Sequence, residues 1–190
     1  MISKYTHDIV FNKEDFASQN LVGHEFDNCK FIDCSFQACD LSETNFMECE
    51  FTNCDFSMAK LQHTAFKDVV FSNCKLLGMQ FTLCNTFLLS LRFVDCVLDL
   101  SSFFKLPLKA INFTRCSLKE VDFVEANLSS AVFDYCDLSN AIFERSNLEK
   151  ADFSTAINYH IDPELNKIKN AQFSQAGLMG LLYKYNIKVH

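Results

Sequence analysis

The stretch FDNCKFIDCSFQACDLSETNFMECEFTNCDF (residues 26–56) repeats a pattern every five residues. Its first residue, and each fifth residue after it, is Phe or Leu. The same spacing reaches back to Phe11 and forward to Phe81, always with Phe or Leu. We call this residue the centre of its pentapeptide. A period of five fits neither the 3.6 residues of an α-helix nor the alternation of a plain strand, so we expect a corner every five residues.

The spacing slips by two residues within the segment 85–90, NTFLLS, which is apolar. Centres resume at Leu88 and then alternate strictly between Leu and Phe as far as Phe153. We call this segment the break. The sequence predicts its position but not its shape.

The position two residues before each centre is a second inward position. It holds all ten cysteines, and its other occupants are mostly small or β-branched. From Phe16 to Ile157, no Asp, Glu, Lys or Arg occupies either inward position. Charged groups are almost never buried unpaired, so this pattern predicts two inward and three outward positions in every five. A free cysteine behaves as a small hydrophobe, and we interpret the cysteines as core filler, with no metal or cofactor.

Four corners close a coil of 20 residues, and centres twenty apart match, as in Leu21, Leu41 and Leu61. We therefore predict an all-β fold, a right-handed, four-sided parallel β-helix of about seven coils. Residues 1–10 are expected to form an N-terminal cap, 11–157 the β-helix, and 158–190 the remnant of a last coil with a helix and a strand. Stacked aromatic centres should form structural ladders, which include Phe26, Phe31, Phe46, Phe51, Phe66 and Phe71.

The C-terminal segment carries the signals of a short amphipathic helix. Ser174 is a good N-cap, and Asn186 is a plausible left-handed stop. An open β-helix end exposes a bare strand edge, which a cap or self-association removes. We expect a two-fold homodimer through this tail, with an interface that includes a helical stripe and two strand-like residues: Leu178, Leu181, Leu182, Tyr185, Ile187 and Val189.

The repeats, as in CDLSETNFMECEFTNCDF and ADFSTA, resemble the pentapeptide-repeat family over about residues 11–157. The tail INYHIDPELNKIKNAQFSQAGLMGLLYKYNIKV resembles the bacterial branch that contains the Qnr quinolone-resistance proteins and the microcin immunity protein McbG. This resemblance implies a tail that joins two monomers, and a protein that binds DNA gyrase or topoisomerase IV by resembling duplex DNA. The two-residue break is much shorter than the insertions that Qnr proteins use as functional loops.

The charge is uneven along the chain. The formal net charge is −7, but residues 14–68 alone carry eleven acidic and three basic side chains. At a coil spacing of about 4.8 Å, this zone has one net charge per roughly 1.6 Å of rod, close to the about 1.7 Å of duplex DNA. The acidic side chains fit either a solvated surface or a partner-binding surface, for which the candidates are Glu25, Asp27, Asp33, Asp40, Glu43, Glu48, Glu50 and Asp55.

Composition and motifs narrow the remaining function classes. An acidic chain argues against direct binding of nucleic acid. The N-terminus lacks the apolar core of a signal peptide, and no stretch approaches a membrane span, so we expect a cytoplasmic protein without a membrane partner. No catalytic constellation appears, and we expect a protein that is not an enzyme. The alternative to a topoisomerase ligand is an interaction scaffold for an unrelated protein partner.

Overall fold

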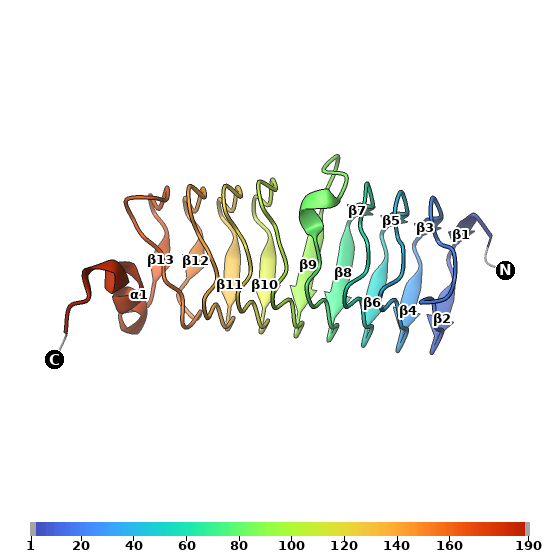
Figure 1. The fold of residues 1–190 in the computed structure, drawn as a ribbon, viewed down its shortest axis with the longest axis horizontal. Helices are drawn as coiled ribbons and strands as arrows, with labels where there is room; N and C mark the ends of the chain where they lie inside the picture. The colour runs from blue at the N-terminus through green and yellow to red at the C-terminus, as the bar shows by residue number, and fades with distance from the viewer. Residues whose placement is uncertain (1–2, 189–190) are drawn as a thin grey trace.

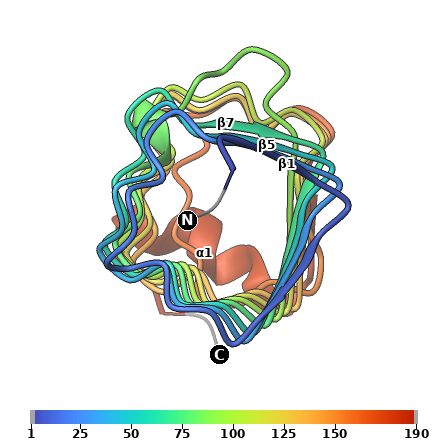
Figure 2. The ribbon, with the colours of Figure 1, turned by 90° about the vertical axis from the view of Figure 1, so that its right-hand side faces the viewer.

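The chain forms a straight rod in the computed structural model, which describes residues 3–188 (Figure 1). Viewed along the rod, successive coils superpose on a four-sided outline (Figure 2). The fold is a parallel β-helix of about eight turns with one short C-terminal helix. The predicted fold class is confirmed, with one turn more than the sequence indicated.

Two of the four faces carry regular parallel strands, and both sheets run along the rod. The first sheet contains β1 (Tyr5–His7), β3 (Glu25–Asp27), β5 (Asn45–Met47) and β7 (Ala65–Lys67). The second contains β2 (Val10–Asn12), β4 (Lys30–Ile32), β6 (Glu50–Thr52), β8 (Val69–Ser72), β9 (Leu91–Val94), β10 (Asn112–Thr114), β11 (Val132–Asp134), β12 (Asp152–Phe153) and β13 (Gln172–Phe173). The other two faces are joined by single bridges such as Asp15 to Ser35 and Asp40 to Lys60.

Paired strands also occur in the segment expected to form the N-terminal cap and in the remnant of a last coil expected within 158–190. Strands β1 and β2 pair with β3 and β4, so most of the expected N-terminal cap already belongs to the coil. At the other end β13 pairs with β12. The five-residue pattern is weaker in the sequence at both ends of the coil. A terminal coil has a neighbouring coil on one side only, so its inward positions need not be as strictly apolar.

The register places each centre directly on the centre of the next coil. Phe31 pairs with Phe51, and their rings stack 4.7 Å apart at 12°. Rings on adjacent faces meet edge to face, as Phe46 and Phe51 do at 79°. The six predicted ladder residues are all buried, with exposed fractions of 0–1%. The core is therefore a filled column of rings rather than a channel.

The second inward position has a polar function as well as a packing one. The hydroxyl of Thr44 donates a hydrogen bond to the carbonyl of Leu21 at 2.8 Å, and the thiol of Cys49 donates to the carbonyl of Phe26 at 3.4 Å. Small side chains with a weak or strong donor suit this position because they fill space and pair with a backbone carbonyl. All ten cysteines are buried, as the sequence predicted.

The corners explain how the chain turns with so few glycines. The last residue of most pentapeptides has a positive φ, for example Asp33 at 55° and Glu48 at 53°. This left-handed conformation costs non-glycine residues roughly 1–2 kcal/mol each. The corner N–H groups are aligned to pair with the next coil, as from Asp33 to the carbonyl of Thr52 at 2.9 Å. Coil-to-coil hydrogen bonds and ring stacking offset the cost.

The break bulges outward from the rod. It follows η1 (Phe81–Leu83) and projects beyond the face that carries β1, β5 and β7 (Figure 2). Phe87 and Leu88 are 69% and 64% exposed, whereas Leu89 packs partly against the core. The prediction that Leu88 is an inward centre is wrong: the two extra residues move Leu88 into the bulge, where its φ is 58°.

The C-terminal segment closes the end of the coil with one short helical unit. It consists of η2 (Ala176–Leu178), α1 (Met179–Leu182) and η3 (Tyr183–Tyr185). The Ser174 hydroxyl accepts a hydrogen bond from the Gly177 N–H at 3.0 Å, and Asn186 has a φ of 53°, so both predicted ends are confirmed. The predicted strand is not present at Ile187, and Val189 lies outside the described residues.

The helical unit needs glycine where it crosses the last coil. A Cβ at Gly180 would lie 2.2 Å from the carbonyl oxygen of Tyr159, so no larger residue fits there. Within the described residues, no helix is both long and apolar enough to cross a membrane.

Candidate interaction surfaces

The outer side of the coil is the main surface that the protein offers to a partner, because its interior is filled. Within the described residues, no group of His, Cys, Asp and Glu side chains is arranged to hold a metal ion. Burial raises the pKa of Cys39 to about 11, with a further contribution from the nearby Asp40. Burial likewise raises the pKa of Cys49 to about 12. These thiols stay protonated and enclosed at neutral pH.

The predicted acidic residues form a belt around the N-terminal coils rather than a patch on one face. They are spread over all four faces: Glu25, Asp27 and Glu48 at the first sheet, Asp33 and Glu50 at the second, Asp55 on the third face, and Asp40 and Glu43 on the fourth. We call these eight residues the acidic belt. The period of five distributes outward residues around the rod, so closeness in sequence does not place them side by side.

Several members of the belt are paired with lysines one coil away. Lys30 lies 3.0 Å from Glu50, Lys75 lies 3.6 Å from Asp55, and Lys60 lies 4.0 Å from Asp40. These pairs are half-exposed, and such exposed pairs contribute little to stability. The other five members have no such partner within the described residues and remain the strongest candidates for contact with a cationic surface: Glu25, Asp27, Asp33, Glu43 and Glu48.

Hydrogen bonds keep two belt carboxylates ionised. The hydroxyl and the N–H of Ser42 both donate to Asp40 and hold its pKa below the ordinary range. Partial burial raises the pKa of Asp55, but hydrogen bonds from Ser57 outweigh it and the net shift is downward. Both groups therefore carry full negative charge at neutral pH.

The tail presents apolar side chains at the C-terminal end of the rod. Leu178, Tyr185 and Ile187 are 46–53% exposed, and Leu182 is 36% exposed. Leu181 instead is partly buried and packs against the core. The structure thus places five of the six predicted interface residues in its described part and brings four of them to the surface.

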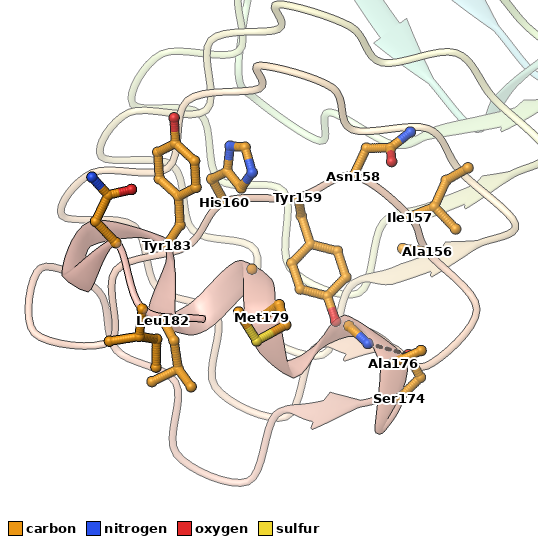
Figure 3. A pocket seen from close by; sticks show the side chains of 14 residues that line it. Ala156, Ile157, Asn158, Tyr159, His160, Ser174, Ala176, Met179, Leu182 and Tyr183 are labelled. Carbon is orange, nitrogen blue, oxygen red and sulfur yellow. Dashed lines mark hydrogen bonds between the residues drawn. The ribbon is translucent and has the colours of Figure 1, made fainter. Parts of the chain in front are cut away.

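A hollow lies between the tail and the last coil, and Figure 3 shows the side chains that line it. Tyr159 projects into it from the coil, while His160 stacks on Tyr183 with ring centroids 3.9 Å apart. The ammonium group of Lys184 in the tail forms ion pairs with the carboxylates of Asp162 at 2.9 Å and Glu164 at 2.6 Å. These contacts hold the helical unit in one orientation and keep its exposed leucines directed outward.

The break is the surface feature that sequence reasoning missed. Both Phe87 and Leu88 are exposed, and Leu88 lines a hollow together with Met47, Lys67 and Leu89, among others. The sequence marks the break by two additional residues within an apolar segment. An apolar segment is normally predicted to be buried, however, and only the structure shows that the break lies on the outside of the rod.

Comparisons with known proteins agree with this architecture. Models described as pentapeptide repeats and pentapeptide repeat region match residues 15–47, 44–123, 111–149 and 122–157, and together they span most of the coil. The chain belongs to the pentapeptide-repeat family. A search of curated proteins found no significant match.

Two solved structures place the fold among its relatives. The first is a trypsin-treated variant of QnrB1, a plasmid-mediated fluoroquinolone resistance protein, with a TM-score of 0.62, 17% identity, and coverage of 98% of this chain and 100% of that chain. The second is HetL of the cyanobacterium Nostoc sp. strain PCC 7120, involved in regulating heterocyst differentiation, with a TM-score of 0.52, 16% identity, and coverage of 90% and 86%. At these identities the likeness establishes the fold.

Proposed function

We propose that this protein is a non-enzymatic mimic of duplex DNA that binds a type II topoisomerase, DNA gyrase or topoisomerase IV, and confers immunity or quinolone tolerance. The observation that carries the proposal is the charge of the N-terminal coils, which approaches that of DNA per length of rod. The likeness of the whole chain to the fold of QnrB1 supports it. The protein would act in the cytoplasm, where its partner works.

The belt suits this function because it surrounds the rod. Duplex DNA also presents phosphates on all sides, and an enzyme that encloses DNA contacts more than one of them. A cationic channel would meet Glu25, Asp27 and Glu48 on one side and Asp33 and Glu50 on the next. We also propose that the exposed tail leucines join two copies end to end, which would place one belt at each outer end of the dimer.

The test is a gyrase supercoiling titration with the purified full-length protein, with and without a fluoroquinolone. Inhibition alone would identify an inhibitor, and restored activity in the presence of the drug would identify a protective factor. Either effect should appear at micromolar protein or below. No effect at large excess on gyrase or topoisomerase IV would overturn the proposal.

The second candidate is an interaction scaffold for an unrelated protein. It is favoured by the ion pairs that neutralise part of the belt, and by a fold shared with HetL, whose stated role is in differentiation. The combined substitution Glu25→Lys, Asp27→Lys, Glu48→Lys and Glu50→Lys separates the two. A scaffold would lose its captured partner while topoisomerase assays remain unchanged.

A further inference from the structure

The charges on one face of the rod are sorted by sign along its length. This face contains β1, β3, β5 and β7, then the break, and then the segments 107–109, 127–129, 147–149 and 167–169, each directly preceding a strand of the second sheet. We call it the β7 face and include its corner towards the second sheet. N-terminal to the break it carries Asp8, Glu25, Asp27, Glu48 and Asp68 against Lys4 and Lys67; C-terminal to it, Lys109, Lys150, Lys167 and Lys169 against Glu149.

These charges are not compensated within the chain. The Lys–carboxylate and Arg–carboxylate pairs of the coil lie on the other three faces and join neighbouring coils, such as Asp95 with Arg115 and Glu125 with Arg145. On the described part of the β7 face, no lysine lies within 4.0 Å of a carboxylate, and only His7 beside Asp8 approaches one. The four C-terminal lysines are all exposed and can contact a second molecule: Lys109, Lys150, Lys167 and Lys169.

We infer that the β7 face binds the same face of a second copy, side by side and antiparallel. A two-fold axis near the break brings the acidic half of each copy against the basic half of the other, as an isologous interface requires. Asp27 then lies opposite the level of Lys150, and Asp68 opposite the level of Lys109. A parallel arrangement would place like charges against each other, so the charge pattern selects the antiparallel one.

The break supplies the apolar centre of this interface. The bulge of the break lies along the rod between the coils of β7 and β10 (Figure 1), and its Phe87 and Leu88 are exposed. The hollow beside them, lined by Met47, Lys67 and Leu89, opens on the β7 face. The two breaks pass each other near the axis, and each apolar tip enters the hollow of the other copy. An exposed aromatic side chain within a ring of charges is the usual form of an interface centre.

The dimensions imply a weak complex. Eight coil intervals of about 4.8 Å and a face about 13 Å wide offer roughly 500 Å² per copy, near the lower limit for specific association. Its dependence on exposed charges means that salt weakens it. This interface is separate from the proposed tail contact, and the inference does not depend on topoisomerase binding.

The experiment measures self-association by sedimentation in the full-length chain carrying Leu178→Asp and Leu182→Asp, which removes any tail contact. We expect this protein to associate at about 100 µM in low salt and to lose about tenfold in affinity at 0.5 M salt. Asp27→Lys, Glu48→Lys and Asp68→Lys together should abolish association, as should Lys109→Glu, Lys150→Glu and Lys169→Glu together. An equimolar mixture of the two reversed proteins should associate again.

Circular dichroism checks that each reversed protein is folded. If one is not, two singly substituted proteins, Asp68→Lys and Lys109→Glu, replace the two triple variants. The matched control reverses Lys30, Lys60 and Lys75, which lie on the other faces, and should leave association unchanged. A monomeric parent at low salt, a reversed protein that still self-associates, or a mixture that stays monomeric would each overturn the inference. The lysine-reversed protein retains the acidic belt, so its effect on gyrase supercoiling tests the proposed function separately.

Discussion

At the scale of single residues, the fold depends on how much each centre contributes to the column. Phe51 stacks on Phe31 and Phe71 and meets Phe46 and Phe56 edge to face. It has no exposed surface, so a replacement cannot move outward to solvent. Its neighbours above and below belong to the same rigid ladder and cannot collapse into a gap.

Phe51 therefore gives a graded stability prediction. Phe51→Leu, which places a leucine centre in a ladder that is otherwise all phenylalanine, should lower the free energy of unfolding by about 1–2 kcal/mol, and Phe51→Ala by about 4 kcal/mol. Phe51→Asp should prevent folding because it buries an unpaired carboxylate. Urea unfolding followed by circular dichroism measures the series. A stable Phe51→Asp protein would contradict the packed ladder.

The cysteines make the stability sensitive to alkaline pH. In the unfolded chain a thiol ionises near pH 8.5, whereas burial raises the pKa of Cys39 to about 11 and of Cys49 to about 12. Above about pH 8.5 the unfolded state therefore releases protons that the native state keeps, and stability falls as the pH rises. The melting temperature should decline from about pH 9 to 11. Cys39→Ala with Cys49→Ala should reduce the slope, and an unchanged slope would exclude these thiols as its cause.

At the scale of elements, the coil accommodates the two additional residues of the break in an outward bulge, and a deletion can test this. Deleting Thr86 and Phe87 would restore the five-residue spacing and put Leu88 at a centre, between the inward Cys84 and Leu91. We expect a folded rod with a melting temperature equal to or above that of the parent, since an exposed leucine becomes buried. Thermal unfolding measures this. A marked loss of stability would mean that the bulge packs favourably, contrary to its exposure.

The tail is the second element with a testable role. Leu178→Asp with Leu182→Asp should yield monomers at micromolar concentrations without a large loss of stability, because both side chains are already partly exposed. Leu83→Asp with Leu100→Asp is the matched control, since these leucines are 43% and 54% exposed and line neither hollow beside the tail. Sedimentation distinguishes the pairs. A double tail variant that still dimerises at these concentrations would exclude the tail as the interface.

The two elements also show where sequence reasoning reached its limit. The period of five predicted the coil, the inward positions and the ladders because these follow from local spacing and burial. It did not predict that Leu88 lies outside, because apolar character alone does not reveal which residues an insertion displaces. It assigned Leu181 to the tail surface, although this residue is partly buried against the core. It listed the belt acids as one surface, but only the coil geometry shows that they surround the rod.

At the scale of the whole molecule, charge is distributed in two ways that can be separated. The belt gives the N-terminal coils their high acidity, whereas the C-terminal coils are nearly neutral overall. A topoisomerase surface that binds duplex DNA is cationic, so the N-terminal coils should contribute most of its attraction to this rod. The neutral half would then serve mainly to carry the tail.

The corresponding prediction concerns inhibition of gyrase supercoiling. Glu25→Lys, Asp27→Lys, Glu48→Lys and Glu50→Lys together should raise the concentration for half-inhibition by at least about tenfold, since each lost contact between charges costs a substantial part of the attraction. The control reverses the same number of acids in the C-terminal coils, Asp99, Glu120, Asp122 and Glu144, and changes the total charge equally. If charge density along the rod is what the enzyme recognises, the control should retain most of the inhibition. Equal losses in both proteins would show that only net charge matters, and the mimicry of DNA by the N-terminal coils would be wrong.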